Sequence, residues 1–205
     1  MTSLSTLVDS GLTDKNTQHS YLDLYEELLG HKRNTATCII EVGIGCFFDK
    51  NGGSLKLWKD YFTYELIAIH GIDILPKERV IEDLIDHPNV VLHCSSDAYN
   101  FDFINDTFYS KNIKADFILD DGAHTLESMK IFLSLYLPLL KQDGILIIED
   151  VQDISWIDIL KGYVPGDLKE FIKVYDLRHV KNRYDDIVFV VDRSNSHVDK
   201  QYNQI

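Results

Sequence analysis

The sequence predicts a single α/β domain in which helices cover both faces of a seven-stranded, mostly parallel sheet. Three observations predict this class. The chain has 205 residues, 45% of them hydrophobic, which suffices for one core but would leave two cores undersized. Short apolar runs alternate with segments of helical spacing, as they do in doubly wound sheets. The last two runs are joined only by the polar turn RHVKNRYDD, which predicts an antiparallel hairpin because parallel strands need a crossover of about a dozen residues.

Each apolar run is expected to form a strand, and each amphipathic segment a helix. The expected strands are residues 38–42, 66–72, 90–92, 117–119, 145–148, 171–175 and 187–191. The expected helices are residues 21–29, 54–62, 77–85, 101–109 and 126–140. Around a sheet domain at residues 34–195, we expect an amino-terminal helical lid at 1–33 and a polar tail at 196–205. Seven strands that end in a hairpin are typical of Rossmann-like class I S-adenosylmethionine-dependent methyltransferases.

Composition argues against several classes of partner. The formal net charge is −13, which opposes binding to nucleic acid or to anionic membranes. No stretch approaches the roughly 20 apolar residues of a membrane span, and the amino terminus does not resemble a secretory signal. The cysteines, Cys38, Cys46 and Cys94, are odd in number and lack CxxC spacing, which favours a reducing, cytoplasmic compartment.

The first strand ends in IIEVGIG, a pattern suited to close approach by a ligand. Gly43 and Gly45 allow backbone conformations closed to other residues, and Glu41 can receive an amine or a hydroxyl. Ser54 is expected near the cap of the next helix, beside the same turn. A dinucleotide fingerprint would need a third glycine where Phe48 stands, so no diphosphate cradle is predicted. The alternative is a tight turn without a ligand.

The following strands end in acids that suit a nucleoside. Asp73 ends the second run, where a carboxylate can accept both ribose hydroxyls, although it could equally begin a turn. Ser96 and Asp97 follow the third run, where Asp97 could accept the adenine amino group; both residue types also favour plain turns. Asp120, at the end of the fourth run, is assigned to the same cofactor side. Together these positions predict a nucleoside pocket that fits S-adenosylmethionine.

The fourth and fifth runs end in FILDDGAHTLES and GILIIEDVQD, and together they predict a metal site. If the two strands are neighbours, Asp121 meets Glu149 and Asp150 at one edge of the sheet. Carboxylates so close repel one another unless a cation joins them, and oxygen ligands suit Mg²⁺, Mn²⁺ or Ca²⁺.

His124 follows three residues after Asp121, and we expect it on the first turn of a helix beside the ion. Histidine titrates near neutrality and can take a proton from a bound hydroxyl. The alternative is that Asp121 or Thr125 only caps the helix and that His124 is solvated at its start.

Three stretches resemble a family of Mg²⁺-dependent class I sugar O-methyltransferases. They are TDKNTQHSYLDLYEELL, then EVGIG with GGSLKLWKDYF and GIDILP, and DDGAHTLESMKIFLSLYLPLLKQDGILIIEDVQ. The family includes the macrocin and mycinamicin O-methyltransferases and the rhamnosyl O-methyltransferase/cephalosporin-hydroxylase-like group. The similarity spans about residues 11–155, and the pairing of DDGxH with IED is its most specific part.

This resemblance implies methyl transfer from S-adenosylmethionine to a sugar hydroxyl of a small-molecule or glycan acceptor. It implies that Asp121 binds Mg²⁺ (or Mn²⁺) with Glu149 and Asp150, and that His124 is the base. It further implies that Lys15, His19 and Tyr21 lie over the cofactor, the alternative being an amphipathic helix packed on the sheet. The amino-terminal domain of the macrolide enzymes is expected to be missing, so the acceptor pocket would come from the chain's own loops or from a second copy in a homo-oligomer.

Two other functions stay open. A catechol also offers two adjacent oxygens to a metal, so a catechol-type O-methyltransferase is an alternative, ranked lower because a histidine base in DDGxH follows the sugar family. A non-catalytic domain that only binds S-adenosylmethionine or another nucleoside is the other alternative. Binding alone does not require a base beside an ion, which argues against it.

Overall fold

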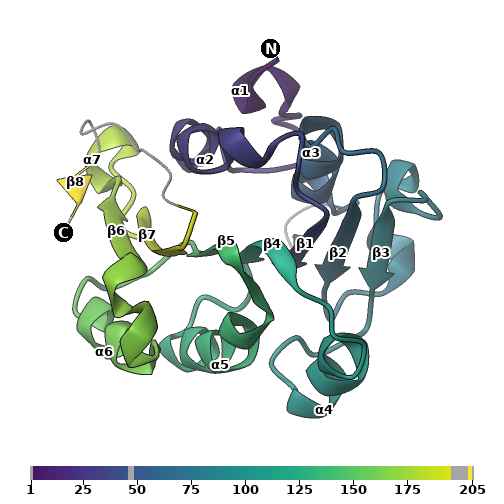
Figure 1. Ribbon diagram of the computed structural model, residues 1–205. Helices are drawn as coiled ribbons and strands as arrows, with labels where there is room; N and C mark the ends of the chain where they lie inside the picture. The colour runs from purple at the N-terminus through teal and green to yellow at the C-terminus, as the bar shows by residue number, and fades with distance from the viewer. Residues whose placement is uncertain (1, 46–48, 195–202, 205) are drawn as a thin grey trace.

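A single twisted sheet with helices on both faces makes up the computed structural model, which describes residues 2–45 and 49–194 and the backbone of 203–204 (Figure 1). The strand order is β3-β2-β1-β4-β5-β7-β6-β8. Pairing is parallel from β3 to β5, and β7 is antiparallel to both β5 and β6. The strands are β1 Cys38–Val42, β2 Ala68–Ile72, β3 Val90–His93, β4 Ala115–Asp120, β5 Leu140–Ile148, β6 Ile172–Asp176, β7 Ile187–Asp192 and β8 Asn203–Gln204.

All seven predicted strands and the terminal hairpin are confirmed. The two-residue strand β8 adds an antiparallel edge beside β6. The rest of the predicted tail at 196–205 lies outside the described residues, as do Cys46 and Phe48. The two cysteines that the structure describes, Cys38 and Cys94, carry free thiols.

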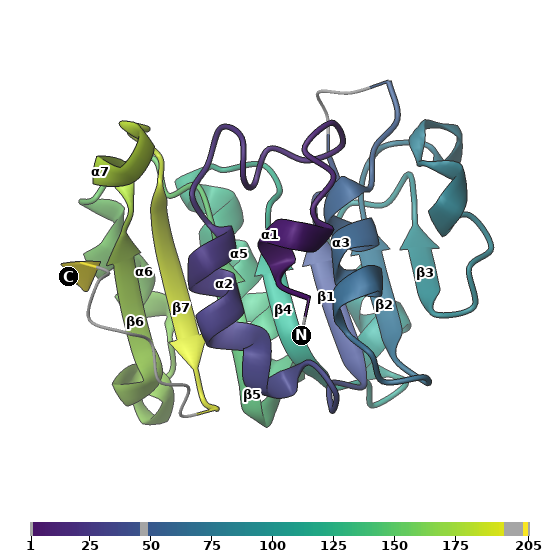
Figure 2. The ribbon, with the colours of Figure 1, turned by 90° about the horizontal axis from the view of Figure 1, so that it is seen from above.

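Helices cover both faces of the sheet, as predicted. On one face lie α1 Leu4–Leu7, α2 Leu22–Leu29 and α3 Gly53–Tyr61; on the other lie α4 Phe101–Ile104, α5 Leu126–Tyr136 and α6 Trp156–Tyr163 (Figures 1 and 2). A single helical turn, α7 Arg178–Lys181, occupies the β6–β7 connection. Within the described ranges, no helix is long and apolar enough to cross a membrane.

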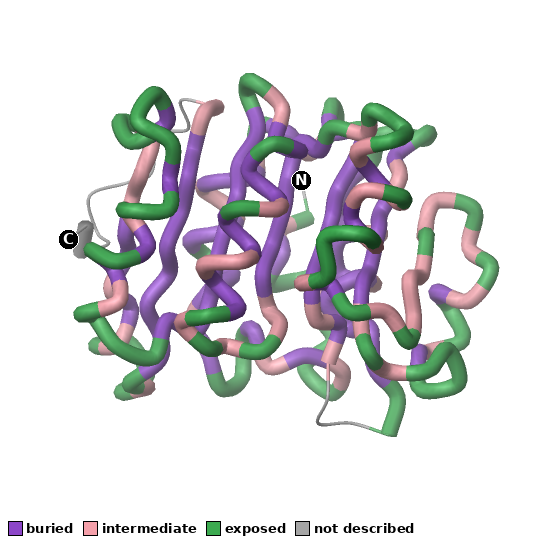
Figure 3. Tube along the Cα trace, turned by 90° about the horizontal axis from the view of Figure 1, so that it is seen from below, coloured by how far each residue is buried: buried purple, intermediate pink, exposed green. Residues whose placement is uncertain are grey.

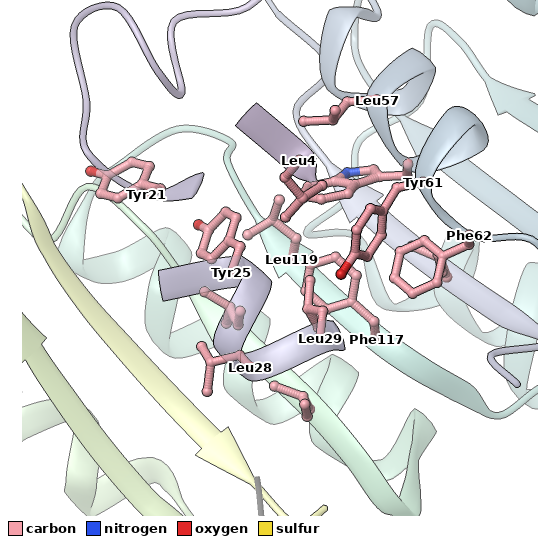
Figure 4. Packing of buried hydrophobic residues seen from close by; sticks show 14 of the residues in the cluster. Leu4, Tyr21, Tyr25, Leu28, Leu29, Leu57, Tyr61, Phe62, Phe117 and Leu119 are labelled. Atoms are coloured by element: carbon pink, nitrogen blue, oxygen red, sulfur yellow. The ribbon is translucent and has the colours of Figure 1, made fainter. Parts of the chain in front are cut away.

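Two hydrophobic clusters, one on each face, enclose the central strands. Along β4, Phe117 and Leu119 belong to the cluster under α2 and α3, whereas Ile118 belongs to the cluster over α5. Successive side chains of a strand point to opposite faces, so the middle of β4 is apolar on both faces, and all residues of the strand are buried (Figure 3). Figure 4 shows the first cluster, where Tyr25, Tyr61 and Phe117 converge.

The helix expected at 77–85 is absent, and that prediction was wrong. Two short 3₁₀ turns stand there instead, Lys77–Arg79 and Glu82–Leu84. Between them Val80 forms an isolated parallel bridge with Asn51, whose amide donates to the Arg79 carbonyl at 2.7 Å. A residue that pairs with a distant chain segment cannot also keep helical hydrogen bonds, so tertiary contacts override the helical spacing here.

The helix α6 was not predicted from the sequence. Two other helices, at 101–109 and 126–140, were predicted to be longer than they are. The segment at 101–109 is α-helical to Ile104 and continues as a π-turn over 105–109. The helix at 126–140 ends at Tyr136 and gives way to the 3₁₀ turn Leu137–Leu139, in which Pro138 lacks the amide donor that a longer helix would need.

Candidate active site

A cavity of about 660 Å³ opens at the carboxyl ends of the parallel strands. Ligands bind at this edge in open α/β sheets. The segment between α1 and α2 runs along the same edge in Figure 2 and contributes to the wall through Leu12, Thr13, Asp14, Gln18 and His19. The predicted site residues that line the cavity are His19, Gly43, Gly45, Ser54, Asp73, Ser96, Asp97, Asp121, His124 and Asp150.

Five other predicted residues lie behind the cavity wall and are not part of its lining. They are Lys15, Tyr21, Glu41, Asp120 and Glu149. All five are buried, with at most 3% of each residue exposed. They can therefore act on a ligand only through their neighbours or after a rearrangement.

The turn after β1 brings two strand ends into contact, which explains its glycines. Gly43 has φ +79, and a Cβ there would lie 1.9 Å from the backbone oxygen of Asp121. Gly45 has φ +120, and a Cβ there would lie 2.9 Å from the side-chain oxygen of Asn51. Only glycine permits both the conformation and the approach. The backbone after β1 can thus pass directly beside the end of β4 and form part of the cavity wall.

Asp73 both lines the cavity and organises its wall. One carboxylate oxygen accepts from the Ile44 amide at 2.8 Å, and the other accepts from the Leu75 amide at 2.9 Å. Each oxygen keeps a second lone pair, so these bonds leave capacity for ribose hydroxyls. Asp97 makes a turn of the same kind, accepting from the Tyr99 amide at 2.9 Å. The turn alternative and the ligand prediction are therefore compatible at both positions.

Glu41 faces the α3 side of the sheet. The Trp58 indole donates to one carboxylate oxygen at 3.0 Å, while the other oxygen has no hydrogen-bond partner among the described residues. Burial raises the pKa of Glu41 to about 7, against the opposing effects of Lys15, Ser54 and Trp58. Its predicted contact with a cofactor amine stays a prediction.

Asp120 is connected to the cavity through a tyrosine that the sequence reading missed. The Tyr99 hydroxyl donates to Asp120 at 2.9 Å and accepts from the Ala123 amide at 3.1 Å. Tyr99 itself lines the cavity. Asp120 lies behind it, and burial raises the pKa of this carboxyl group to about 7. Asp120 therefore holds the DDGAH loop in place, and its assignment to the cofactor stays a prediction.

The acids that end β4 and β5 meet, as neighbouring strands require. Asp120 pairs with Ile148 in the parallel register, so Asp121 stands beside Glu149. The Lys15 ammonium joins them: it donates to Asp121 at 2.6 Å and also to Glu149. The second Glu149 oxygen accepts from the Tyr25 hydroxyl.

Asp150 is held by two other residues of the amino-terminal segment. Its Oδ1 accepts from the Tyr21 hydroxyl and lies 3.2 Å from Nδ1 of His19. The same His19 nitrogen lies 2.6 Å from Asp186, which precedes β7 and is fully buried. Lys15, His19 and Tyr21, the three residues that the resemblance selected, therefore contact an acid cluster that consists of Asp121, Glu149 and Asp150.

His124 stands just before α5 and not on its first turn, where it was expected. Thr125 is the N-cap, forming a reciprocal capping box with Ser128, and His124 precedes it with φ 51. Nε2 of His124 lies 3.7 Å from Oδ1 of Asp121 and 3.6 Å from Oδ2 of Asp150. Thr125 does cap the helix, as the alternative held, but this leaves both His124 and Asp121 facing the cavity.

The donor atoms at this point fit a hard divalent cation. Asp121, His124 and Asp150 each offer one ligand atom within 4.8 Å of the others. Carboxylate oxygens are the ligands that Mg²⁺ and Mn²⁺ prefer, and the open cavity leaves room for water or hydroxyl ligands. His19, Asp150 and Asp186 form a second group with similar spacing, fully inside the protein.

The carboxyl groups of the acid cluster differ in the direction in which the protein shifts their pKa. Burial raises the pKa of Glu149 well above its ordinary value, with the Asp121 charge adding to the effect, and the same two causes raise that of Asp150. Burial also opposes ionisation of Asp121, but Lys15 and His124 outweigh it and hold its pKa below the ordinary value. Added positive charge among these groups would therefore favour the ionised forms.

Comparison with characterised proteins identifies sugar O-methyltransferases as relatives. The chain is 30% identical over 146 residues to 8-demethyl-8-alpha-L-rhamnosyl tetracenomycin-C 2'-O-methyltransferase of Streptomyces olivaceus, a match that covers 70% of this chain and 36% of the relative. It is 26% identical to mycinamicin VI 2''-O-methyltransferase of Micromonospora griseorubida, over 67% of this chain and 33% of that enzyme. The matched region is thus about a third of each relative. No family model matches.

Solved structures show the same fold. The methyltransferase MycE of mycinamycin biosynthesis, in complex with Mg and SAH, superposes with a TM-score of 0.68 at 22% identity, over 97% of this chain and 57% of MycE. A complex that also holds mycinamycin VI gives a TM-score of 0.67 at 20% identity. The predicted Rossmann-like methyltransferase fold is confirmed, and the predicted resemblance to sugar O-methyltransferases is confirmed by the relatives.

Proposed function

We propose that this chain is a divalent-metal-dependent O-methyltransferase that transfers a methyl group from S-adenosylmethionine to a sugar hydroxyl. The observation that carries the proposal is the junction of two features at one edge of the sheet. A cavity of about 660 Å³, walled by Asp73 and Asp97, ends at Asp121, His124 and Asp150. The curated relatives are sugar O-methyltransferases, which supports the choice of reaction.

The cavity supplies the contacts that a nucleoside needs. Asp73, Ser96 and Asp97 line the cavity, where Asp73 would accept the ribose hydroxyls and Asp97 and Ser96 would receive the adenine amino group. Gly43 and Gly45 allow the backbone to approach the amino-acid part of the cofactor. No phosphate cradle is required, because the cofactor carries a sulfonium, an amine and a carboxylate in place of phosphates.

Asp121 and Asp150 would hold Mg²⁺ or Mn²⁺ through the oxygens that face His124. Glu149 belongs to the same cluster, and its participation depends on Lys15. When bound, the cofactor supplies an activated methyl group and the ion lowers the pKa of a hydroxyl that it holds. Alignment of the bound reactants supplies roughly 7–11 kcal/mol, more than proton removal alone.

His124 is the base in this proposal. Its Nε2 lies beside both carboxylates and lines the cavity, so it can take the proton of a hydroxyl held at the ion. The carboxylates of Asp121 and Asp150 stand next to this nitrogen.

The acceptor would enter from the side of the cavity formed by the β6–β7 connection and the loop after β5. Gln152, Arg183 and Asp185 line this side and offer polar groups to a sugar. MycE has been crystallised with mycinamycin VI, which supports a glycosylated small molecule as acceptor. The names of the relatives specify sugar positions, which favours a sugar over a catechol.

Transfer of an isotope-labelled methyl group tests this proposal. Labelled S-adenosylmethionine is incubated with rhamnosyl and other deoxysugar glycosides, with a catechol in parallel, in Mg²⁺ and in EDTA. We expect labelled glycoside only when Mg²⁺ is present. Label on the catechol alone would favour the catechol alternative, and cofactor binding without any transfer would favour a binding domain.

Replacing Asp121 separates metal binding from cofactor binding. Asp121→Ala is expected to abolish metal-dependent transfer while S-adenosylmethionine still binds, because Asp121 faces the ion and not the nucleoside. Isothermal titration measures the cofactor affinity. Asp158→Asn, on the exposed side of α6, is the matched control and should keep full activity. Loss of cofactor binding in the Asp121 variant would instead assign that residue to the nucleoside pocket.

A further inference from the structure

We propose that Lys15 and the divalent ion are alternative partners of Asp121 and Glu149, so that loading the metal displaces Lys15 and loosens the amino-terminal segment. This inference rests on the metal site of the proposed function. It goes beyond that function because it assigns to Lys15 a competing role and to the segment between α1 and α2 a metal-dependent opening.

Lys15 occupies the position between the two strand ends. Its side chain is fully buried, and its ammonium donates to Asp121 at 2.6 Å and to Glu149. In the part of the chain that the structure describes, no other lysine or arginine pairs with either carboxylate. The Lys15 ammonium therefore stands where an ion that bridges Asp121 and Glu149 would need to bind.

Glu149 cannot reach an ion in the cavity while Lys15 and Tyr25 hold it. Lys15 occupies one of its oxygens and the Tyr25 hydroxyl the other. The residue is 1% exposed and does not line the cavity. Because the Lys15 ammonium stands between Glu149 and Asp121, an ion that bridges these two carboxylates would have to take its place.

The two oxygens of Asp121 also favour replacement of Lys15 by the ion over the binding of both cations at once. Asp121 turns Oδ2 toward Lys15 and Oδ1 toward His124, so an ion at Oδ1 would stand close to the ammonium. Like charges at such a separation repel strongly inside a protein. An ion that replaces the ammonium meets the same carboxylates without this repulsion.

Displacement of Lys15 would change the cavity wall. Along the chain, Lys15 follows Thr13 and Asp14 and precedes His19, and these three neighbours line the cavity. The segment is otherwise fastened by His19 to Asp186 and by Lys181, which donates to the Asn16 carbonyl at 2.6 Å. Releasing Lys15 therefore removes an inner anchor while the outer ones hold the segment near the cavity.

Calorimetric titration with Mn²⁺ or Mg²⁺ alone, without cofactor, tests the competition. In Lys15→Met we expect a metal dissociation constant at least about tenfold lower than in the wild type, because the competing charge is gone. Lys15→Arg keeps the charge and should bind metal no more tightly than the wild type. Lys32→Met is the matched control: Lys32 is also buried, but it pairs with Asp143 at 3.0 Å at the opposite end of the strands, and its loss should leave the metal affinity unchanged.

Hydrogen exchange of the wild type provides a measurement that does not depend on a variant's folding. Adding Mg²⁺ should accelerate exchange of amides in residues 12–20, and the Asp121→Asn variant should not show this response. Slower or unchanged exchange in the wild type would overturn the inference, as would equal or weaker metal binding by Lys15→Met. Either result, with wild-type metal binding intact, leaves the proposed function in place. Absence of metal binding to the wild type would overturn both.

Discussion

At the scale of single residues, the site combines unusual backbone with buried charge. His124 and Asp150 both have positive φ, 51 and 55, which costs energy for residues other than glycine. His124 directly precedes the N-cap of α5, and Asp150 follows the end of β5. Nε2 of His124 and Oδ2 of Asp150 lie 3.6 Å apart.

Replacing His124 tests its role as the base. His124→Asn suits a left-handed conformation, so the loop should keep its shape. We expect turnover to fall roughly 10²–10⁴-fold while cofactor affinity changes little. The measurement is single-turnover methyl transfer across pH. A rate equal to that of the wild type would exclude His124 as the base.

Gly43 is the residue at which the fold has the least tolerance for a side chain. Gly43→Ala would put a Cβ 1.9 Å from the Asp121 carbonyl oxygen at a positive φ. Overpacking and the left-handed backbone together should destabilise the protein by roughly 2–5 kcal/mol. Urea unfolding measures the loss.

Gly162→Ala is the control for the same substitution. A Cβ at Gly162, inside α6, meets nothing within 4 Å. This variant should be more stable than the wild type by about 0.5–1 kcal/mol. Similar effects of the two substitutions would contradict the close contact between the ends of β1 and β4.

At the scale of secondary-structure elements, burial decided what could be predicted. The strands β1, β4 and β7 are buried along their whole length, and such strands appear in a sequence as continuous apolar runs. The segment at 77–85 has helical spacing but pairs with Asn51, a contact across a distance that periodicity cannot reveal. The helix α6 was missed although its segment carries a local signal, since Ile157 and Leu160 are buried at helical spacing.

The pairing of β2 with β3 carries a pH dependence of its own. His70 and His93 stack with ring centroids 5.4 Å apart, and Nδ1 of His70 lies 3.1 Å from Nε2 of His93. Burial lowers the pKa of His70 to about 4 and lowers that of His93. Below the ordinary histidine pKa of about 6.5, the unfolded chain therefore binds protons that the native pair does not.

Stability should consequently decrease as pH falls from about 6.5 toward 4 through this pair. Urea unfolding at pH 7 and pH 5 measures the decrease in the wild type and in His70→Gln. The variant should lose less stability between these two pH values, because one of the two buried imidazoles has been removed. An equal loss in both proteins would mean that the pKa of His70 is the same in the folded and the unfolded chain.

At the scale of the whole molecule, the site joins segments that lie far apart in the sequence. The meeting of Asp121 with Glu149 and Asp150 could be predicted, because neighbouring parallel strands end at one edge. The partners that enclose them, Tyr25 and Asp186, could not: the packing of α2 on the sheet places Tyr25, and the turn that leads into β7 places Asp186. The burial of a single hydroxyl or carboxylate at such a point does not change the spacing of apolar residues along the chain.

The proposed mechanism requires a single cation between the ends of β4 and β5, at the inner end of the cavity. Anomalous diffraction from crystals grown with Mn²⁺ and S-adenosylhomocysteine measures its position. We predict one peak within about 2.5 Å of carboxylate oxygens of both Asp121 and Asp150, facing His124 and next to the sulfur of the cofactor. A bound cofactor with no peak there, and with Lys15 still between Asp121 and Glu149, would contradict the metal-dependent mechanism.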